Sequence, residues 1–331
     1  MIRSVGKFLG RSALAVIAVG GAFWVFGPYE EVNLSPEFEP RRFGEGVQVY
    51  FESIESQYKD ITPGVAKRVI WQDGFKEQRT PYSVVYLHGF SATSEEIRPV
   101  PDRVAEALGA NLVYTRMRGH GRGSDPMMEA TASDWMQDTA EALAAGRAVG
   151  EQVVVIATST GATLAAAAAL NPELSKDVAA AVFISPNFGL NDPFAWVLTL
   201  PAARYWAPLV MGGERVTSSG DTVKDQYWTT RYSWGALAPL AALVRDVEAL
   251  DFSEVRIPAL FRLSDEDRVV RPDLGHEVAG RWGATALVQV VKMGPEDDPS
   301  AHVITGDIMS PGQTDETVRD IMAWLEAHGI K

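Results

Sequence analysis

The sequence predicts an α/β fold with a mostly parallel central sheet that is flanked by helices. The chain has 331 residues and 46% of them are hydrophobic, so it is long enough to bury one large core. From about residue 43, segments of strand composition alternate with segments of helix composition, which is typical of βαβ units. Residues 83–87 form an almost continuous apolar run, as expected for a strand that is covered on both faces.

The elements follow one another in a regular order. Strands are expected at residues 47–50, 65–70, 83–87, 111–115, 153–156, 180–184, 259–263 and 287–291. Helices are expected at residues 94–108, at 133–150, directly after the strand at 153–156, and at 314–327. Ser133 is expected to cap its helix. Glu95 and Glu96 are expected in the first turn of theirs, where carboxylates favour the helix dipole.

The N-terminal segment, residues 1–30, is predicted to be a secretory signal or a membrane anchor. Arg3, Lys7 and Arg11 precede an apolar run at residues 12–28. Small residues are poorly placed for cleavage, and aromatic residues that suit a membrane interface follow, so an uncleaved anchor is favoured over a cleaved signal. Either alternative predicts a membrane-associated or exported protein whose folded domain lies outside the cytoplasm.

Composition excludes several classes of function. The formal net charge of −13 repels phosphate backbones, so nucleic acid is not expected as a partner. Cysteine is absent, which excludes disulfides, thiol catalysis and cysteine-based metal sites. The acidic run Glu296-Asp297-Asp298 is expected to be a solvated loop. No metal and no cofactor are expected.

Residues 188–251 interrupt the alternation of strands and helices. They separate two strands by far more than one helix requires, and they are rich in Trp, Tyr and Phe. Such an insertion over the edge of a parallel sheet is expected to be a cap that covers a substrate pocket. The alternative is additional core, and the two can coexist. The core domain is therefore predicted to comprise residues 43–187 and 252–331.

The segment around Ser159 carries the clearest chemical signal. An apolar strand at 153–156 stops at Ala157-Thr158-Ser159-Thr160-Gly161, and an Ala-rich helical stretch follows at once. A serine at the apex of a sharp strand-to-helix turn is the arrangement of a nucleophile, with small residues two positions before and after it. Glycine is usual at the first of these positions, and the methyl group of Ala157 is expected to be tolerated. The alternative is an ordinary loop between strand and helix.

A nucleophilic serine needs a base, and the base needs an orienting carboxylate. In a fold of this kind the three follow in the order Ser, acid, His. The strand at 259–263 runs into Asp265, Glu266 and Asp267. Asp267 is favoured because it precedes a Val269-Val270 pair whose apolar side chains would anchor the loop. Asp265 and Glu266 are alternatives, which are otherwise expected to be solvated.

The position of the base follows from the order of the strands. His302 lies beyond the last predicted strand and before the final helix. His276 precedes that strand, so it lies on the wrong side of it. His328 sits at the end of the final helix, where a solvated histidine is expected. The sequence therefore favours His302.

Five motifs in this order make the chain resemble the α/β-hydrolase superfamily, in particular its monoacylglycerol-lipase, lysophospholipase and carboxylesterase-like branch. The resemblance covers most of the chain from Ser83 to the C-terminus. The motifs are Leu87-His88-Gly89-Phe90, Arg118-Gly119-His120-Gly121-Arg122, the turn around Ser159, the Asp267-Arg268-Val269-Val270 turn and the His302-Val303 turn. Ala157 is the one departure from the family pattern.

The resemblance implies a serine hydrolase that cleaves carboxylic esters, with a small-molecule or lipid-like acyl substrate. Ser159 is expected to form an acyl-enzyme, His302 to act as base and Asp267 to orient it. The backbone N–H groups of Phe90 and Thr160 are expected to form the oxyanion hole.

The same motifs leave other functions open. His88 and His120 are expected to brace their loops and not to act as bases. A thioesterase, an amidase or an acyltransferase would use the same catalytic residues. The remaining alternative is a catalytically silent binding protein on the same fold. Such a protein would have no need for Ser159, Asp267 and His302 all to be present.

Overall fold

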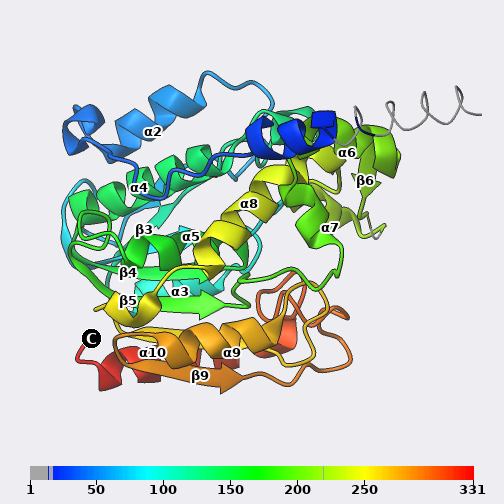
Figure 1. Ribbon diagram of the computed structural model, residues 1–331. Helices are drawn as coiled ribbons and strands as arrows, with labels where there is room; N and C mark the ends of the chain where they lie inside the picture. Colours follow the sequence, from blue (N-terminus) through cyan, green and yellow to red (C-terminus); the bar gives the residue numbers. More distant parts are fainter. Residues whose placement is uncertain (1–13, 15–17, 219) are drawn as a thin grey trace, which may run out of the picture.

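The computed structural model describes residues 14, 18–218 and 220–331 (Figure 1). Within them lies a seven-stranded sheet of order β1-β3-β2-β4-β5-β8-β9 and a two-stranded ribbon of β6 and β7. The strands are β1 Arg68–Ile70, β2 Thr80–Leu87, β3 Asn111–Tyr114, β4 Gly150–Thr158, β5 Val178–Ile184, β6 Glu214–Val216, β7 Arg231–Ser233, β8 Ala259–Leu263 and β9 Ala286–Val290. The α-helices are α2 Val47–Glu55, α3 Val100–Ala107, α4 Ala132–Val149, α5 Thr160–Ala169, α6 Ala203–Met211, α7 Thr222–Tyr227, α8 Leu237–Glu248, α9 Pro272–Arg281 and α10 Thr314–Ala327.

The sheet confirms the predicted fold class. β2 pairs in parallel with β3 and β4, β4 with β5, β5 with β8 and β8 with β9, while β1 is antiparallel to β3. Alternate side chains of each central strand face two separate cores, because successive residues of a strand point to opposite faces. In β2, Val85 and Leu87 join the core under α4, α5 and α8, whereas Val84 and Tyr86 join the core under α3 and α10.

Three sequence-based expectations about elements are wrong. The segment 47–50 is the start of helix α2 and not a strand, because Val47, Phe51 and Glu55 are buried at a spacing of four residues. Helix α4 is capped by Thr131 and not by Ser133: Thr131 and Asp134 form a reciprocal capping box. The stretch before α3 is a series of turns, so the helix begins at Val100 instead of residue 94.

The predicted membrane anchor is also wrong. Within residues 14, 18–218 and 220–331, no helix is long and apolar enough to cross a membrane. Residues 1–13 and 15–17 of the predicted segment lie outside the described residues. This finding contradicts the predicted membrane-associated or exported location.

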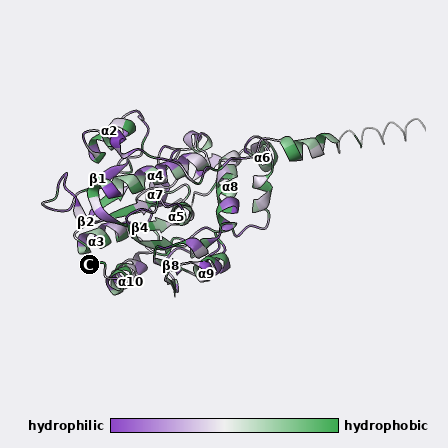
Figure 2. Ribbon diagram, turned by 60° about the vertical axis from the view of Figure 1, so that its left-hand side comes forward, coloured by the Kyte–Doolittle hydropathy of each residue, from purple (hydrophilic) through white to green (hydrophobic). Residues whose placement is uncertain are grey.

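The residues that follow the helical stretch at 18–26 pack on the insertion. The backbone N–H of Ala202 donates to the carbonyl of Pro28 at 2.6 Å. Arg204 holds both carboxylate oxygens of Glu30, at 2.7 and 2.8 Å. The C-terminal end of the helical turns at residues 18–26 therefore lies next to the start of α6, at one end of the molecule (Figure 2).

The insertion at residues 188–251 has two parts. α6, α7, β6 and β7 lie together beyond the edge of the sheet, whereas α8 packs against α4 and α5 (Figure 1). The first part touches the loop that follows β2. The backbone N–H of Thr229 donates to the carbonyl of Ser91 at 2.7 Å, and the ring of Tyr232 lies 5.4 Å from that of Phe90.

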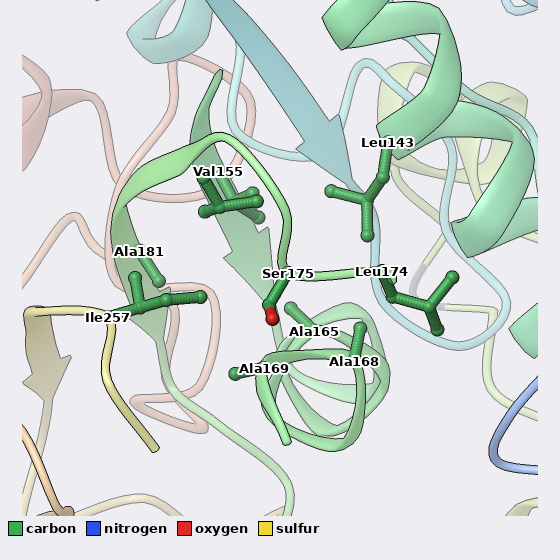
Figure 3. Close-up of a pocket in the computed structure, with 10 residues that line it drawn as sticks. Leu143, Val155, Ala165, Ala168, Ala169, Leu174, Ser175, Ala181 and Ile257 are labelled. Carbon is green, nitrogen blue, oxygen red and sulfur yellow. The ribbon is translucent and has the colours of Figure 1, made fainter. Parts of the chain in front are cut away.

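A small cavity lies between α5 and the strands beneath it. Its lining consists of apolar side chains with Ser175, whose hydroxyl points into it (Figure 3). Ala165, Ala168 and Ala169 of α5 border the cavity, and Ser159 does not. The cavity therefore belongs to the packing of the Ala-rich helix and not to the site described below.

A buried cluster of charges fixes the loop that follows β3. Lys67 is 6% exposed, and its ammonium donates to Asp138 at 2.7 Å and also to Glu141. Burial opposes the charged form of Lys67, but the two carboxylates outweigh it and raise its pKa. The other oxygen of Asp138 accepts the backbone N–H of Arg118 at 2.6 Å. The cluster therefore positions residues 116–122, which pack against the loop after β2 through the rings of His120 and Phe90.

We expect Lys67→Met to destabilise the protein by about 3–5 kcal/mol, because it leaves two buried carboxylates without a cation. Urea denaturation at pH 7 measures the free energy of unfolding. Lys59→Met is the matched control: Lys59 is exposed, and its substitution is expected to change stability by no more than about 0.5 kcal/mol. Equal effects of the two substitutions would contradict the assignment.

Candidate active site

Ser159 occupies the turn between β4 and α5. Its backbone has φ 51° and ψ −116°, a conformation that costs energy for a residue with a side chain. The turn is held in place because the backbone N–H of Ser159 donates to the carbonyl of Ile184 on the neighbouring strand, at 2.9 Å. The chain therefore reverses sharply at the C-terminal end of β4 and presents this side chain at the edge of the sheet.

The small residues on either side of Ser159 pack against different neighbours. A Cβ atom on Gly161 would lie 2.2 Å from the carbonyl oxygen of Leu87, so only glycine fits against the end of β2. Ala157 is fully buried, yet its methyl group is accommodated within the strand pairing of β2 and β5. The sequence pattern around Ser159 thus reflects the packing of the turn on β2.

Three of the predicted site residues form a hydrogen-bonded chain. His302 Nε2 lies 3.0 Å from Ser159 Oγ, and His302 Nδ1 lies 2.7 Å from Asp267 Oδ2. All three side chains are at most 10% exposed. They follow β4, β8 and β9, whose carboxyl ends meet at the same edge of the parallel sheet. With Nδ1 donating to the carboxylate, Nε2 is left to accept the serine proton.

The loop of Asp267 is fixed by backbone hydrogen bonds. Asp267 Oδ1 accepts the N–H groups of Val269 and Val270 at 2.8 and 2.9 Å, which leaves Oδ2 for His302. Val270 is buried but Val269 is 42% exposed, so only one of the two valines anchors the loop by its side chain. Asp265 instead pairs with His276 at 2.7 Å on the surface.

The turn that carries His302 depends on a carboxylate that the sequence reading placed in solvent. Asp298 Oδ2 accepts the backbone N–H groups of His302 and Val303, at 3.2 and 2.9 Å. Asp297 and Asp298 are 8% and 5% exposed, so the expectation of a solvated acidic loop is wrong for both. A run of acidic residues in a loop is usually solvated, so the sequence pattern does not indicate that these two are buried.

The charge state of His302 is set by its carboxylate neighbours. Burial disfavours the imidazolium, but the hydrogen bond and charge of Asp267, with smaller contributions from Glu96 and Asp298, raise the pKa of His302 above its usual value. A raised pKa makes this imidazole a better proton acceptor at pH values where it is still neutral.

The two predicted oxyanion donors belong to the turns on either side of Ser159. Thr160 is the first residue of α5, where a backbone N–H has no partner within the helix. Phe90 lies in the loop after β2, and among the described residues its N–H donates to no protein acceptor. Its ring is held edge-on by those of His120, Trp135 and Tyr232.

His88 and His120 support this loop from beneath. His88 Nε2 accepts the backbone N–H of Met117 at 3.1 Å, and its Nδ1 lies 2.9 Å from the carbonyl of Gly89. Burial lowers the pKa of His88 well below its usual value and lowers that of His120 to about 4. Both imidazoles are neutral: His88 is engaged at both ring nitrogens and links the loops after β2 and β3, whereas His120 is engaged through Nδ1, which lies 3.1 Å from the carbonyl of Arg118.

Sequence reasoning missed one further carboxylate at the site. Glu96 was expected in the first turn of a helix, with no role at the site, but it is 2% exposed and accepts the backbone N–H of Gly89 at 2.7 Å. Two adjacent glutamates give no sign in the sequence of which one is buried. Glu95 and Glu96 are chemically identical, and only the backbone of their turn decides which side chain points inward. Glu95 points outward, to Arg68 and Arg98.

With this geometry the chain can be compared with known proteins. Residues 84–304 match the alpha/beta hydrolase family, and this stretch is more than half of the chain. The chain therefore belongs to the alpha/beta hydrolase family, as its motifs predicted.

Individual relatives agree with this assignment. The thermostable monoacylglycerol lipase of Bacillus sp. (strain H-257) is 27% identical over 205 residues, which cover 60% of this chain and 75% of the lipase. A structure from the metagenome-derived lipolytic enzymes LipS and LipT superposes with a TM-score of 0.66 at 20% identity, covering 81% of this chain and 100% of its own. Monoglyceride lipase from Saccharomyces cerevisiae gives a TM-score of 0.57 at 10% identity, covering 80% and 91%. The two structures share the fold of this chain.

We expect Gly161→Ala to unfold or displace the turn, because the new methyl group would meet the carbonyl of Leu87 at 2.2 Å. Thermal denaturation should show a clear loss of stability, on the order of the 1–3 kcal/mol that overpacking costs. Gly280→Ala is the matched control, since Gly280 is exposed in α9 and a Cβ there meets nothing within 4 Å. That change is expected to stabilise the helix by up to about 1 kcal/mol. A Gly161→Ala protein as stable as wild type would refute the packing explanation.

Proposed function

We propose that this protein is a serine ester hydrolase that cleaves carboxylic esters of lipid-like acyl groups. The observation that supports this most is the chain of hydrogen bonds from Asp267 through His302 to Ser159, at 2.7 and 3.0 Å. A serine is activated as a nucleophile when a base lies within hydrogen-bond reach and a third group orients that base.

In the proposed reaction, Ser159 Oγ attacks the ester carbonyl while His302 Nε2 takes the hydroxyl proton. His302 then passes the proton to the leaving alcohol, and an acyl-enzyme remains on Ser159. Water attacks this ester with His302 again as base, which releases the acid and restores the serine. Asp267 holds the imidazole in the required tautomer and stabilises the imidazolium.

The proposed oxyanion donors are the backbone N–H groups of Phe90 and Thr160. The tetrahedral intermediate carries its negative charge where these two turns meet, beside Ser159. Donors that are already oriented need no rearrangement during the reaction, and each contributes roughly 3–4 kcal/mol in comparable sites. The cross-braced loop of Phe90 supplies such fixed orientation.

The lipid-like substrate class is supported by the cap, which we propose to be the insertion at residues 188–251, with α8 as its connection to the core. The cap touches the loop after β2 through Thr229 and Tyr232. This loop carries Gly89 and the proposed donor Phe90 and is called the oxyanion loop below. The cap exposes large apolar side chains, which suit a substrate with an apolar chain. These are Phe194, Trp196, Tyr205, Leu209, Val210, Met211, Val216 and Val223. The names of the lipases similar to this chain point the same way.

We expect Ser159→Ala to abolish ester hydrolysis, by about 10⁶-fold, while the fold is retained. Hydrolysis of p-nitrophenyl esters of increasing chain length measures both the activity and the preferred acyl group, and circular dichroism checks the fold. A fluorophosphonate probe should label the wild-type protein and not the variant. A folded Ser159→Ala protein with near-normal activity would exclude the proposed nucleophile.

We expect Asp267→Asn to reduce kcat by about 10⁴-fold, because it removes the carboxylate that holds the imidazole tautomer. Asp265→Asn is the matched control two residues away. Asp265 and its partner His276 are on the surface, so this change should leave kcat close to that of wild type. The reverse outcome would assign the orienting role to Asp265.

A further inference from the structure

Glu96 is a buried carboxylate that the proposed reaction does not use. It is 2% exposed, and among the described residues no cationic side chain forms a salt bridge with it. Its Oε2 accepts the backbone N–H of Gly89 at 2.7 Å and the phenol of Tyr86 at 2.9 Å. A buried carboxylate without a cation lowers the stability of the protein, so its presence at this position calls for an explanation.

The contacts of Glu96 reach both turns of the site. The phenol of Tyr86 also lies 3.2 Å from Thr158 Oγ1, the residue directly before the nucleophile. Because a phenol has one proton, and that proton goes to Glu96, the hydroxyl of Thr158 is the donor to Tyr86. The carboxylate is thus linked to the oxyanion loop through Gly89 and to the end of β4 through Tyr86 and Thr158.

Gly89 allows this carboxylate to lie close to the nucleophile. A Cβ atom on Gly89 would lie 2.6 Å from Glu96 Oε1 and 3.2 Å from the Cβ of Ser159. The carboxylate and the Cβ of Ser159 therefore both face the space that a side chain at position 89 would fill, and only the absence of that side chain lets them come so close together. From there its negative charge also acts on His302.

We propose that Glu96 is a positioning residue for the hydrolysis: its carboxylate fixes the Gly89–Phe90 backbone for oxyanion binding, and its charge favours the imidazolium form of His302. The inference rests on the proposed function, and it adds a second carboxylate to the control of the base. The hydrogen bond acts on geometry and the charge acts on proton affinity, so the two effects can be separated by substitution.

The charged and titratable groups around His302 define the expected pH dependence. Asp267 faces its Nδ1, Asp298 holds its backbone and Glu96 acts from the oxyanion loop, and all three raise its pKa. Burial raises the pKa of Glu96 itself, while the donors Gly89 and Tyr86 and the charge of His302 oppose that rise. The base must be neutral to accept the serine proton, so kcat/KM falls as pH drops through the pKa of His302. Removing the charge of Glu96 lowers that pKa and moves the acid limb to lower pH.

The test measures kcat/KM against pH for wild type and three variants with one p-nitrophenyl ester. Glu96→Gln keeps an oxygen acceptor for Gly89 and Tyr86 but removes the charge. Glu96→Asp keeps the charge but withdraws the carboxylate by one methylene from Gly89. Glu95→Gln is the control, because Glu95 pairs with Arg68 and Arg98 away from the site. Thermal denaturation of every variant reports on folding.

We expect Glu96→Gln to shift the acid limb to lower pH while kcat on the alkaline plateau stays within about tenfold of wild type. We expect Glu96→Asp to leave the acid limb in place and to reduce plateau kcat by about 10²-fold, the cost of a misplaced oxyanion donor. Glu95→Gln should match wild type in both respects.

Other outcomes overturn the inference. An acid limb that does not move in folded Glu96→Gln would show that the charge does not act on the base. An unchanged plateau in Glu96→Asp would show that the hydrogen bond to Gly89 does not position the loop, and this variant carries the test alone if Glu96→Gln fails to fold. These results are distinct from failure of the proposed function, which would appear as wild-type hydrolysis that survives Ser159→Ala.

Discussion

The contact on which the site depends is the close packing of the Gly161 backbone against the carbonyl of Leu87. A Cβ at this position would lie 2.2 Å from that oxygen, so the turn after β4 can approach the end of β2 only with glycine there. The approach brings Ser159 beside the loop of Gly89 and Phe90. The strained backbone of Ser159 is maintained by the neighbouring strands, through the hydrogen bond from its N–H to Ile184.

Buried carboxylates with specific donors hold the surrounding loops at fixed positions. Asp138 accepts a backbone N–H of the loop after β3, and Asp298 accepts one of the His302 turn. Glu96 accepts a backbone N–H of the loop after β2. Each accepts at least one backbone N–H group, and Asp138 is also paired with Lys67 while Glu96 also accepts the phenol of Tyr86. Such hydrogen bonds are the condition under which a buried charge is tolerated. In this chain irregular loops at the edge of the sheet thus gain a defined geometry from acidic side chains inside the protein.

Local patterns predicted the sheet well and the isolated helices less well. The continuous apolar runs at β2 and β4 can only be central strands, because both of their faces must be buried. The segment at 47–50 has strand composition, yet it forms helix α2, where burial of Val47 and Phe51 against the core decides the conformation. The N-terminal apolar run was likewise interpreted from composition alone, whereas residues 28 and 30 contact the insertion at residues 188–251 through Ala202 and Arg204.

The sequence by itself determined the parallel α/β fold and selected Ser159, Asp267 and His302, because each follows a recognisable strand and parallel strands bring their carboxyl ends to one edge. Only the tertiary structure decided which of the remaining acidic residues are buried. Asp298 was predicted to be solvated, and no burial was predicted for Glu96, since nothing local distinguishes the two from Glu296 and Glu95. Their burial depends on backbone donors that distant segments bring to them, and such partners exist only in the folded chain.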